Sequence, residues 1–481
     1  MSKATNRRQF LSQVAHIGTA ATVGSSALGA LYLSACTDSM AKPTQNVSQN
    51  NETHVLVIGA GMAGLTAARE LHDTGVRVTV IEGRSRIGGR LHTSHTWSDL
   101  PMDLGASWIH GTRNNPITQL ANRYRAERVA TDYDSARLHI AAPLKAAGVT
   151  DTQADSMEAL VNRALKFAAQ SNTDLSLQQA VNQELANKRM SANGMAQLNF
   201  YLNSTYEQEY SGEADELSAW TMEDNETFEG EDVLFPKGYN QISDGLANGL
   251  DIRTGEIVER IDYTNAQQVT VTTTRNTFTG THVIVSLPLG VLKKNVVQFT
   301  PTLPDDKRDA IAKLGMGLLN KHFLRFDKVF WDKSFDWHEY LHTDKGRWTE
   351  WVSFAKVNDT PVLLGFSAAK RARTMEQWSD AQIKAEAMDA LRDMFGSSVP
   401  EPVAHQFTRW SQDPFAYGSY SFNATGSSND DRESLSQPIN QRIFWAGEAC
   451  SSLYPGTVHG AHISGLNAAK ALQKTLKNGS A

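Results

Sequence analysis

Residues 55–90 constrain the fold more than any other part of this 481-residue chain. They begin with an apolar, β-branched run and then break into three glycines with the spacing G-x-G-x-x-G over residues 59–64. A segment of helical composition follows at 65–71, and a second short apolar run at 76–81 ends at Glu82. The order of strand, tight turn, helix, strand and acid predicts a dinucleotide-binding βαβ unit, and therefore an α/β fold.

Each residue of this pattern has a physical reason to be there. Gly59 permits the tight turn, Gly61 lets the backbone approach a pyrophosphate, and Gly64 lets the helix pack close to the sheet. The N-terminus of the helix faces the phosphate charge. Glu82 is placed to accept hydrogen bonds from a ribose hydroxyl. A glycine turn alone is weak evidence, but here a strand, a helix and an acid flank it.

The residues after Glu82 indicate which dinucleotide binds. Residues 84–90 read Arg-Ser-Arg-Ile-Gly-Gly-Arg. Gly89 and its neighbour permit close backbone approach to a polyanion, and Arg84 and Arg90 carry guanidinium groups that pair well with phosphate. This segment resembles the second FAD-binding motif of the flavin amine oxidases, and a nicotinamide enzyme would carry no such element. The resemblance implies a Rossmann-like FAD-binding domain.

Length and composition set further bounds. A chain of 481 residues is too long for one ordinary core, so we expect two domains. The net charge of −6 disfavours a nucleic-acid-binding protein. Cys36 and Cys450 are the two cysteines, which gives no disulfide framework. The fourteen histidines show no paired spacing typical of a metal site, so we expect no metal.

The first 36 residues are interpreted as an export signal. Residues 5–11 resemble a twin-arginine signal, a mildly apolar run follows at 14–33, and residues 33–36 resemble a bacterial lipobox in which Cys36 is lipidated. The alternatives are an ordinary N-terminal helix or a transmembrane anchor, although small and polar residues dilute the run. We expect a polar linker at 37–52 and a protein that is periplasmic or tethered through Cys36 to the periplasmic face of a bacterial membrane.

Residues 103–111 resemble the flavin-side segment of polyamine oxidases. In that family small residues let the backbone lie against the isoalloxazine ring. The resemblance implies a cofactor contact for Gly105, Ala106, Ser107 and Trp108. It also implies that His110 points into the substrate tunnel, although a histidine in a loop is more often structural or solvated.

Residues 207–232 carry eleven acids and no Lys, Arg or His. One interpretation is a solvated acidic face, and the other is a funnel that concentrates a cationic substrate at the mouth of a pocket. Glu223 and Asp224 fall near the place where the related lysine-specific histone demethylase has acids that contact its basic peptide. We therefore predict that these two residues bind substrate.

Two further segments resemble motifs of the flavin amine oxidases and occur along the chain in the same order as in that family. The residue that matches Val258 gives the family's backbone hydrogen bonds to adenine. Residues 319–331 resemble the family's lysine segment, in which the residue matching Lys321 holds a water near flavin N5. Alone, Lys321 would be read as an exposed lysine, but its neighbours are apolar and a buried ammonium must be hydrogen-bonded.

The C-terminal segment, residues 409–461, carries the most detailed match. Trp410 and Tyr420 are implied to line the ring face, and Tyr420 also to contact substrate. Further cofactor contacts are implied at the flavin's ribityl-phosphate end and at a helix N-terminus that faces the ring, where its dipole would stabilise negative charge. The residues concerned are Gly447, Glu448, Thr457 and Val458.

Departures from the monoamine oxidases narrow the activity. Ser419 stands where those enzymes carry the cysteine that bonds FAD, so we expect non-covalent FAD. Thr457 replaces one of their two cage tyrosines, and we expect it to contact substrate. The resemblance implies oxidation of a polyamine or related amine, with an imine hydrolysed to aldehyde and dioxygen reduced to hydrogen peroxide.

Four alternatives stay open. An L-amino-acid oxidase of the same fold would need an arginine that clamps a carboxylate. The others are a monoamine oxidase, an FAD-dependent amine dehydrogenase and an FAD-stabilised binding protein. The presence of Lys321, Trp410 and Tyr420 disfavours the binding protein.

We predict an FAD-binding domain from residues 53–135, 236–305 and 404–475, with an inserted α+β substrate-binding domain from residues 136–235 and 306–403.

Overall fold

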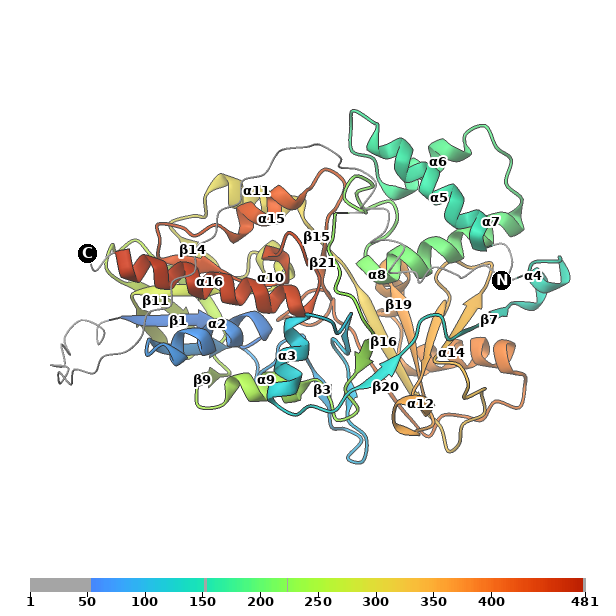
Figure 1. The fold of residues 1–481 in the computed structure, drawn as a ribbon, viewed down its shortest axis with the longest axis horizontal. Coiled ribbons are helices and arrows are strands. Elements are labelled where there is room, and N and C mark those ends of the chain that lie inside the picture. The colour runs from blue at the N-terminus through green and yellow to red at the C-terminus, as the bar shows by residue number, and fades with distance from the viewer. Residues whose placement is uncertain (1–52, 151–153, 223, 479–481) are drawn as a thin grey trace, which may run out of the picture.

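A computed structural model describes residues 53–150, 154–222 and 224–478. The chain forms two lobes, each built around its own sheet (Figure 1). Among the described residues, none of the helices combines the length and apolar character needed to span a bilayer. The export signal, the linker and Cys36 lie outside the described residues, and so does Glu223.

The first lobe contains a five-stranded parallel sheet in the order β22-β13-β1-β2-β9. Side chains of β1 alternate between two cores, with Val55 and Val57 facing the helices, and Leu56 and Ile58 facing a second sheet. A strand buried on both faces must be apolar throughout, which explains the continuous apolar run. The strands are β22 (Ile443–Trp445), β13 (His282–Val285), β1 (His54–Ile58), β2 (Arg77–Glu82) and β9 (Asp251–Thr254).

Two long helices, α2 (Met62–Asp73) and α16 (Val458–Asn478), pack against each other on one face of this sheet (Figure 1). The other face packs on a four-stranded sheet in the order β12-β11-β10-β14. Both helices therefore begin at the same edge of the sheet, where the carboxyl ends of the parallel strands meet. The four strands are β10 (Val258–Asp262), β11 (Val269–Thr273), β12 (Thr277–Gly280) and β14 (Gln298–Thr300).

The second lobe contains a six-stranded sheet in the order β20-β16-β19-β18-β17-β7. Strand β20 (Ala404–Phe407) pairs with β16 and belongs to this sheet. The last segment of the FAD-binding domain was predicted to begin at residue 404, and the pairing shows that residues 404–407 belong to the second lobe instead. The backbone pairing of 404–407 with 322–325 decides this, and no sequence pattern revealed it. The strands are β7 (Ala136–Ile140), β16 (Leu319–Arg325), β17 (Trp337–Leu341), β18 (Glu350–Ser353), β19 (Val362–Ala368) and β20 (Ala404–Phe407).

A helical group packs beside this sheet, at the top right of Figure 1. Its helices are α5 (Ala154–Ala169), α6 (Leu177–Leu185) and α7 (Ala192–Leu202), followed by the π-helix η2 (Asn203–Glu207) and α8 (Gln208–Tyr210). The π-helix has no clear signature in the sequence, because it differs from an α-helix by a single extra residue in the turn.

The remaining elements pack on one of the two lobes or connect them. They are β3 (Thr93–Ser94), β4 (Met102–Asp103), β5 (Trp108–Ile109), α3 (Pro116–Arg123), β6 (Val129–Thr131), α4 (Ala142–Ala146), β8 (Asp232–Leu234), α9 (Asn240–Ala247), α10 (Leu289–Lys293), α11 (Asp305–Lys313), β15 (Gly315–Met316), α12 (Ala355–Asn358), α13 (Ala369–Met375), α14 (Asp380–Phe395), β21 (Ser421–Phe422), α15 (Asn429–Ser436) and η3 (Glu448–Cys450).

Candidate active site

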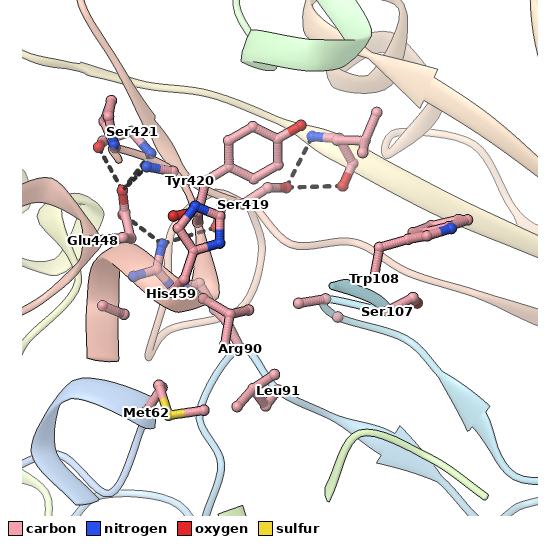
Figure 2. Close-up of a pocket in the computed structure, with 18 of the residues that line it drawn as sticks. Met62, Arg90, Leu91, Ser107, Trp108, Ser419, Tyr420, Ser421, Glu448 and His459 are labelled. Atoms are coloured by element: carbon pink, nitrogen blue, oxygen red, sulfur yellow. Dashed lines mark hydrogen bonds and ion pairs between the residues drawn. The ribbon is translucent and has the colours of Figure 1, made fainter. Parts of the chain in front are cut away.

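One large cavity, of about 1640 Å³, is lined by both lobes. Pockets for single small ligands are usually ~300–1,000 Å³, so there is room here for a cofactor and a substrate together. The walls include the glycine loops, the 103–111 segment, β16, the N-terminus of α16 and part of the acid-rich segment. Figure 2 shows Arg90 beside Ser419 and Glu448, with Trp108 across the cavity.

The glycine loop forms a cradle at one end of the cavity. Gly59 has a φ of +99°, which favours glycine. A Cβ on Gly64 would lie 2.0 Å from the carbonyl oxygen of Gly59, so this glycine sets the close packing of α2 on the loop. Gly61 pairs with Gly88 in a bridge, and a Cβ on Gly89 would lie 3.3 Å from the Gly61 Cα. The two glycine motifs therefore pack against each other.

The N-terminus of α2 can accept an anion. Its N-cap is Gly61, and within the described chain no side chain caps it and its first turn has no acid. Backbone N–H groups of this turn are left to a ligand, as the pyrophosphate of a dinucleotide requires. The residues present fit FAD.

Glu82 lies at the end of β2, buried, with both carboxylate oxygens held. Its Oε2 accepts a hydrogen bond from the Ala60 amide at 2.7 Å, and its Oε1 accepts one from the Arg84 amide at 2.8 Å. Each oxygen keeps a second acceptor position. The carboxylate is thus fixed beside the glycine loop, where it was predicted to bind ribose.

The arginines of the second glycine motif have protein partners. Arg84 makes a two-pronged ion pair with Asp413, with N–O distances of 2.8 and 2.9 Å. Arg90 donates to the Ser419 carbonyl at 2.9 Å and to Glu448 at 2.8 Å. Both residues line the cavity, but their guanidinium groups serve to tie distant segments together. Direct pairing with phosphate stays a prediction.

Glu448 is the centre of a buried network beneath the cavity. Burial alone would raise its pKa, but Arg90, a hydrogen bond from Ser421 and the nearby Arg432 hold the pKa below its usual value. Its Oε2 accepts from the Ser421 hydroxyl at 2.6 Å and from the Gly456 amide at 3.0 Å. The carboxylate therefore orients the loop that leads into α16, and Figure 2 shows its contacts with Ser421 and Arg90.

Thr457 lines the cavity but its hydroxyl is already used. It donates to the Tyr454 carbonyl at 2.8 Å and accepts from the Gly460 amide at 2.9 Å, which caps the N-terminus of α16. A substrate contact through this hydroxyl, as predicted, would have to compete with the cap. Val458 and Gly447 also line the cavity, and their contact with the flavin stays a prediction.

Lys321 is buried in β16 and its ammonium is fully hydrogen-bonded. Nζ donates to the Asp103 carbonyl at 3.0 Å, to the Gly105 carbonyl at 2.5 Å, and to the Ser107 hydroxyl. Burial lowers the pKa of Lys321, and the Asp103 carboxylate opposes this shift. The predicted lysine therefore lies directly behind the predicted flavin-side segment, and Ala106 and Trp108 line the cavity beside it.

Aromatic residues form the wall next to Lys321. Trp410 is buried and donates from Nε1 to the Leu104 carbonyl at 3.2 Å. Tyr420 lines the cavity, and its hydroxyl donates to the Gln208 carbonyl at 2.8 Å. Their predicted position against the flavin ring stays a prediction. Val258 also lines the cavity, at the start of β10, on the side of Glu82.

His110 lines the cavity and is positioned by an acid. Its Nδ1 lies 3.1 Å from the Asp232 carboxylate, whose other oxygen accepts from the Gly111 amide at 2.8 Å. The His110 ring stacks on Trp108 with a centroid distance of 6.2 Å. Sequence reasoning named His110 but missed Asp232, because the 122 residues between them hide the contact.

The acid-rich segment separates into two parts. In the first part, Glu207 and Glu213 pair with Lys345, and Glu216 pairs with Arg373, so these acids are structural. The second part lines the cavity, which favours the funnel for these residues only. They are Glu226, Glu229, Glu231 and Asp232, together with Glu209 from α8.

Asp224 is exposed and is not part of the described cavity wall, so its predicted substrate contact is not supported. The part of its surface that is covered raises the pKa of its carboxyl group. Its near neighbours in the chain line the cavity instead. Phe228 stacks on Tyr454 at a centroid distance of 5.0 Å, and both pack edge-on against His459. Sequence reasoning gave these three no role, since aromatic residues so far apart carry no shared pattern.

Comparison with known proteins identifies the architecture. The family model described as flavin containing amine oxidoreductase matches residues 62–473. Polyamine oxidase 2 of Arabidopsis thaliana is 34% identical over 433 residues, which cover 86% of this chain and 87% of that protein. Lysine-specific histone demethylase 1 homolog 1 of Oryza sativa is 35% identical over 444 residues, and the match covers 85% of this chain but 51% of that protein.

A solved structure shares the fold. It is a redesigned putrescine oxidase with two substitutions, similar with a TM-score of 0.72 and 18% identity, over 88% of this chain and 99% of that one.

Proposed function

The chain belongs to the flavin-containing amine oxidoreductase family, and on that basis we propose that the amine it oxidises is a polyamine. It is an enzyme that oxidises amines, and its cofactor is FAD. The observation that supports a polyamine is the lining of this cavity. It joins the dinucleotide cradle and Lys321 to a wall with five carboxylates, of which Glu229 is paired with Arg113. The five are Glu209, Glu226, Glu229, Glu231 and Asp232. A substrate with several ammonium groups suits such a wall.

Bound FAD supplies the acceptor for the hydride removed from the carbon next to the amine nitrogen, and dioxygen then takes the electrons to give hydrogen peroxide. Trp410 and Tyr420 shape the wall that holds the reacting amine and exclude water from it. His110, oriented by Asp232, and the carboxylates hold the remote nitrogens. Lys321 holds its proton at Nζ among three acceptors, next to the 105–107 backbone on which the cofactor is predicted to lie.

Comparing substrates tests this proposal. Purified holoenzyme is given spermine, spermidine, putrescine, phenylethylamine and a panel of L-amino acids in air, and peroxide and aldehyde are measured. We expect product from the polyamines. Product from phenylethylamine or an amino acid alone would contradict the proposal.

The arginines of the cavity disfavour the L-amino-acid oxidase alternative. Such an enzyme needs a guanidinium group that is available to a carboxylate. Three of the cavity arginines in the described chain pair with carboxylates, and Arg432 is held by neutral partners with its Nη2 left without one. These pairs are Arg84–Asp413, Arg90–Glu448, Arg113–Glu229 and Arg432–Asn423.

We also propose that FAD is bound without a covalent link. Ser419 lies at the position that matches the cysteine of monoamine oxidases, and its hydroxyl donates to the Leu319 carbonyl and accepts from the Leu319 amide, both at 2.8 Å. Acid precipitation of the holoenzyme should therefore release all of its flavin into the supernatant, where absorbance measures it. Flavin that stays with the precipitated protein would contradict this.

We further propose export by the twin-arginine route and lipid attachment at Cys36. This rests on residues 5–11 and 33–36 of the sequence. In a bacterium with that pathway, Cys36→Ser should move the enzyme from the membrane fraction to the soluble fraction and abolish its labelling by radioactive palmitate. Replacing Arg7 and Arg8 with lysine should leave it in the cytoplasm. If wild-type and Cys36→Ser proteins fractionate alike, there is no lipid anchor.

A further inference from the structure

A buried carboxylate lies behind the wall of the cavity, outside its lining. Glu376 follows α13 directly and is 4% exposed. Its Oε1 accepts hydrogen bonds from Asn320 Nδ2 at 2.8 Å and from the Ser411 amide at 3.0 Å, and its Oε2 accepts one from the Ser411 hydroxyl. These donors are all neutral. Because a buried charge is costly, a carboxylate held by neutral partners needs an explanation.

Asn320 connects this carboxylate to two residues of the site. It is 1% exposed, and its Oδ1 accepts from the Trp410 amide at 3.1 Å and from the Thr408 hydroxyl at 2.9 Å. The Thr408 hydroxyl in turn accepts from the Lys321 amide at 2.8 Å. The orientation of the Asn320 amide is fixed, since Glu376 needs a donor and the Trp410 amide needs an acceptor.

Lys321 and Trp410 together hold three consecutive carbonyls. Lys321 Nζ donates to the carbonyls of Asp103 and Gly105, and Trp410 Nε1 donates to the Leu104 carbonyl between them. These carbonyls lead into the segment on which the flavin is predicted to lie. A shift of either side chain relative to the other would therefore move this segment.

We propose that Asn320, held by Glu376, is a positioning residue for amine oxidation. It places Lys321 and Trp410 relative to each other, and through them the 103–107 segment. Asn320 and Lys321 are successive residues of β16, so their side chains point to opposite faces of the strand, and Asn320 acts only through this network. The inference rests on amine oxidation by bound FAD and does not depend on which amine is the substrate.

Asn320→Asp tests the network, because it keeps the acceptor for Trp410 and Thr408 but puts a second carboxylate against Glu376. Repulsion between the two carboxylates should displace the segment that carries Trp410. The limiting rate constant for anaerobic flavin reduction should fall about 10-fold or more, because a displacement of about 1 Å at a reacting site can cost 100-fold. The dissociation constant of the amine should change less than about 3-fold, since neither acid contacts the amine.

The absorbance spectrum of the bound, oxidised flavin provides a second readout that needs no turnover. It reports the surroundings of the ring, so Asn320→Asp holoenzyme should have visible absorbance maxima that differ from those of wild type. Unfolding that merely lowers the amount of enzyme would leave the spectrum of the remaining holoenzyme unchanged.

Adding Glu376→Gln to Asn320→Asp should reverse the loss. The double variant exchanges the amide and the carboxylate between the two positions, so one side chain can again donate to the other. We expect its limiting rate constant to return to within about 3-fold of wild type, and its spectrum to match wild type. Such a non-additive recovery is expected of residues in direct contact.

Two further variants separate positioning from loss of stability. Thr408→Val is nearly isosteric and removes the hydroxyl between Asn320 and Lys321, so it should lower the rate constant about 3-fold, and it provides the test if Asn320→Asp protein does not fold. Ser367→Ala is the matched control. Ser367 lies opposite Asn320 on β19, is 1% exposed, and bonds the His322 ring at 2.8 Å. The alanine variant loses a buried hydrogen bond in the same pair of strands, but its spectrum and rate constant should stay those of wild type.

Three results would overturn the proposal. They are a wild-type spectrum and rate constant in both Asn320→Asp and Thr408→Val, a double variant no better than Asn320→Asp, and a Ser367→Ala enzyme that changes as much as the other variants. If no amine reduces the flavin of the wild-type enzyme, the proposed function fails, and the spectra alone decide whether Asn320 positions the site.

Discussion

Lys321→Met should slow the reduction of the flavin by amine by about 100-fold or more while FAD stays bound. The Lys321 ammonium donates to two carbonyls and a hydroxyl of residues 103–107. Methionine has a similar length but no donors. It would leave these buried acceptors unpaired and remove the positive charge from the predicted ring face.

The measurement is the rate constant for anaerobic bleaching at saturating amine, together with the flavin content of the purified variant. Lys328→Met serves as the control, because Lys328 is exposed just after the same strand and should retain the wild-type rate. Lys321→Arg should recover only part of the rate, since a guanidinium group does not fit three acceptors placed around one nitrogen. A Lys321→Met enzyme that is reduced at the wild-type rate would remove this residue from the site.

Gly61→Ala should weaken FAD binding by about 100-fold without destabilising the fold. Gly61 has a φ of −81°, which alanine adopts readily, and an added Cβ would meet its nearest atom, the Gly88 carbonyl oxygen, at 4.0 Å. The protein itself thus has room for a methyl group here. The space the methyl would fill is the space that the pyrophosphate needs.

Gly64→Ala provides the opposite case. Its Cβ would lie 2.0 Å from the Gly59 carbonyl oxygen, so this variant should lose thermal stability even as apoprotein. Thermal unfolding of the two apoproteins and titration with FAD measure both effects. If Gly61→Ala apoprotein unfolds at a lower temperature and binds FAD normally, the assignment of the cradle is wrong.

Local sequence was enough to predict the dinucleotide cradle. The residues from Gly59 to Glu82 form one βαβ unit, so spacing along the chain corresponds directly to spacing in the structure. Lys321 could be located because a lysine among apolar neighbours is unusual, and the surrounding motif gave it a partner. The N-terminus of α16 was located from the glycine and threonine before it.

Pairings between distant residues could not be predicted. Arg84 was expected to face phosphate, but its guanidinium meets Asp413, which is 329 residues away in the chain. The acid-rich segment gives no sign in its sequence that Lys345 and Arg373 neutralise its first part. Thr457 was expected to contact substrate, because the sequence cannot show that its hydroxyl caps α16.

Anaerobic mixing of the purified holoenzyme with single amines tests the central claim most directly, because it reads electron transfer to the flavin without requiring oxygen. Spermine, spermidine and putrescine are compared with phenylethylamine and L-amino acids while flavin absorbance is recorded. Rapid bleaching by the polyamines, with little by the others, is the predicted result. Bleaching by an aromatic amine or an amino acid but not by any polyamine would contradict the account, and would leave the FAD fold standing without its proposed substrate.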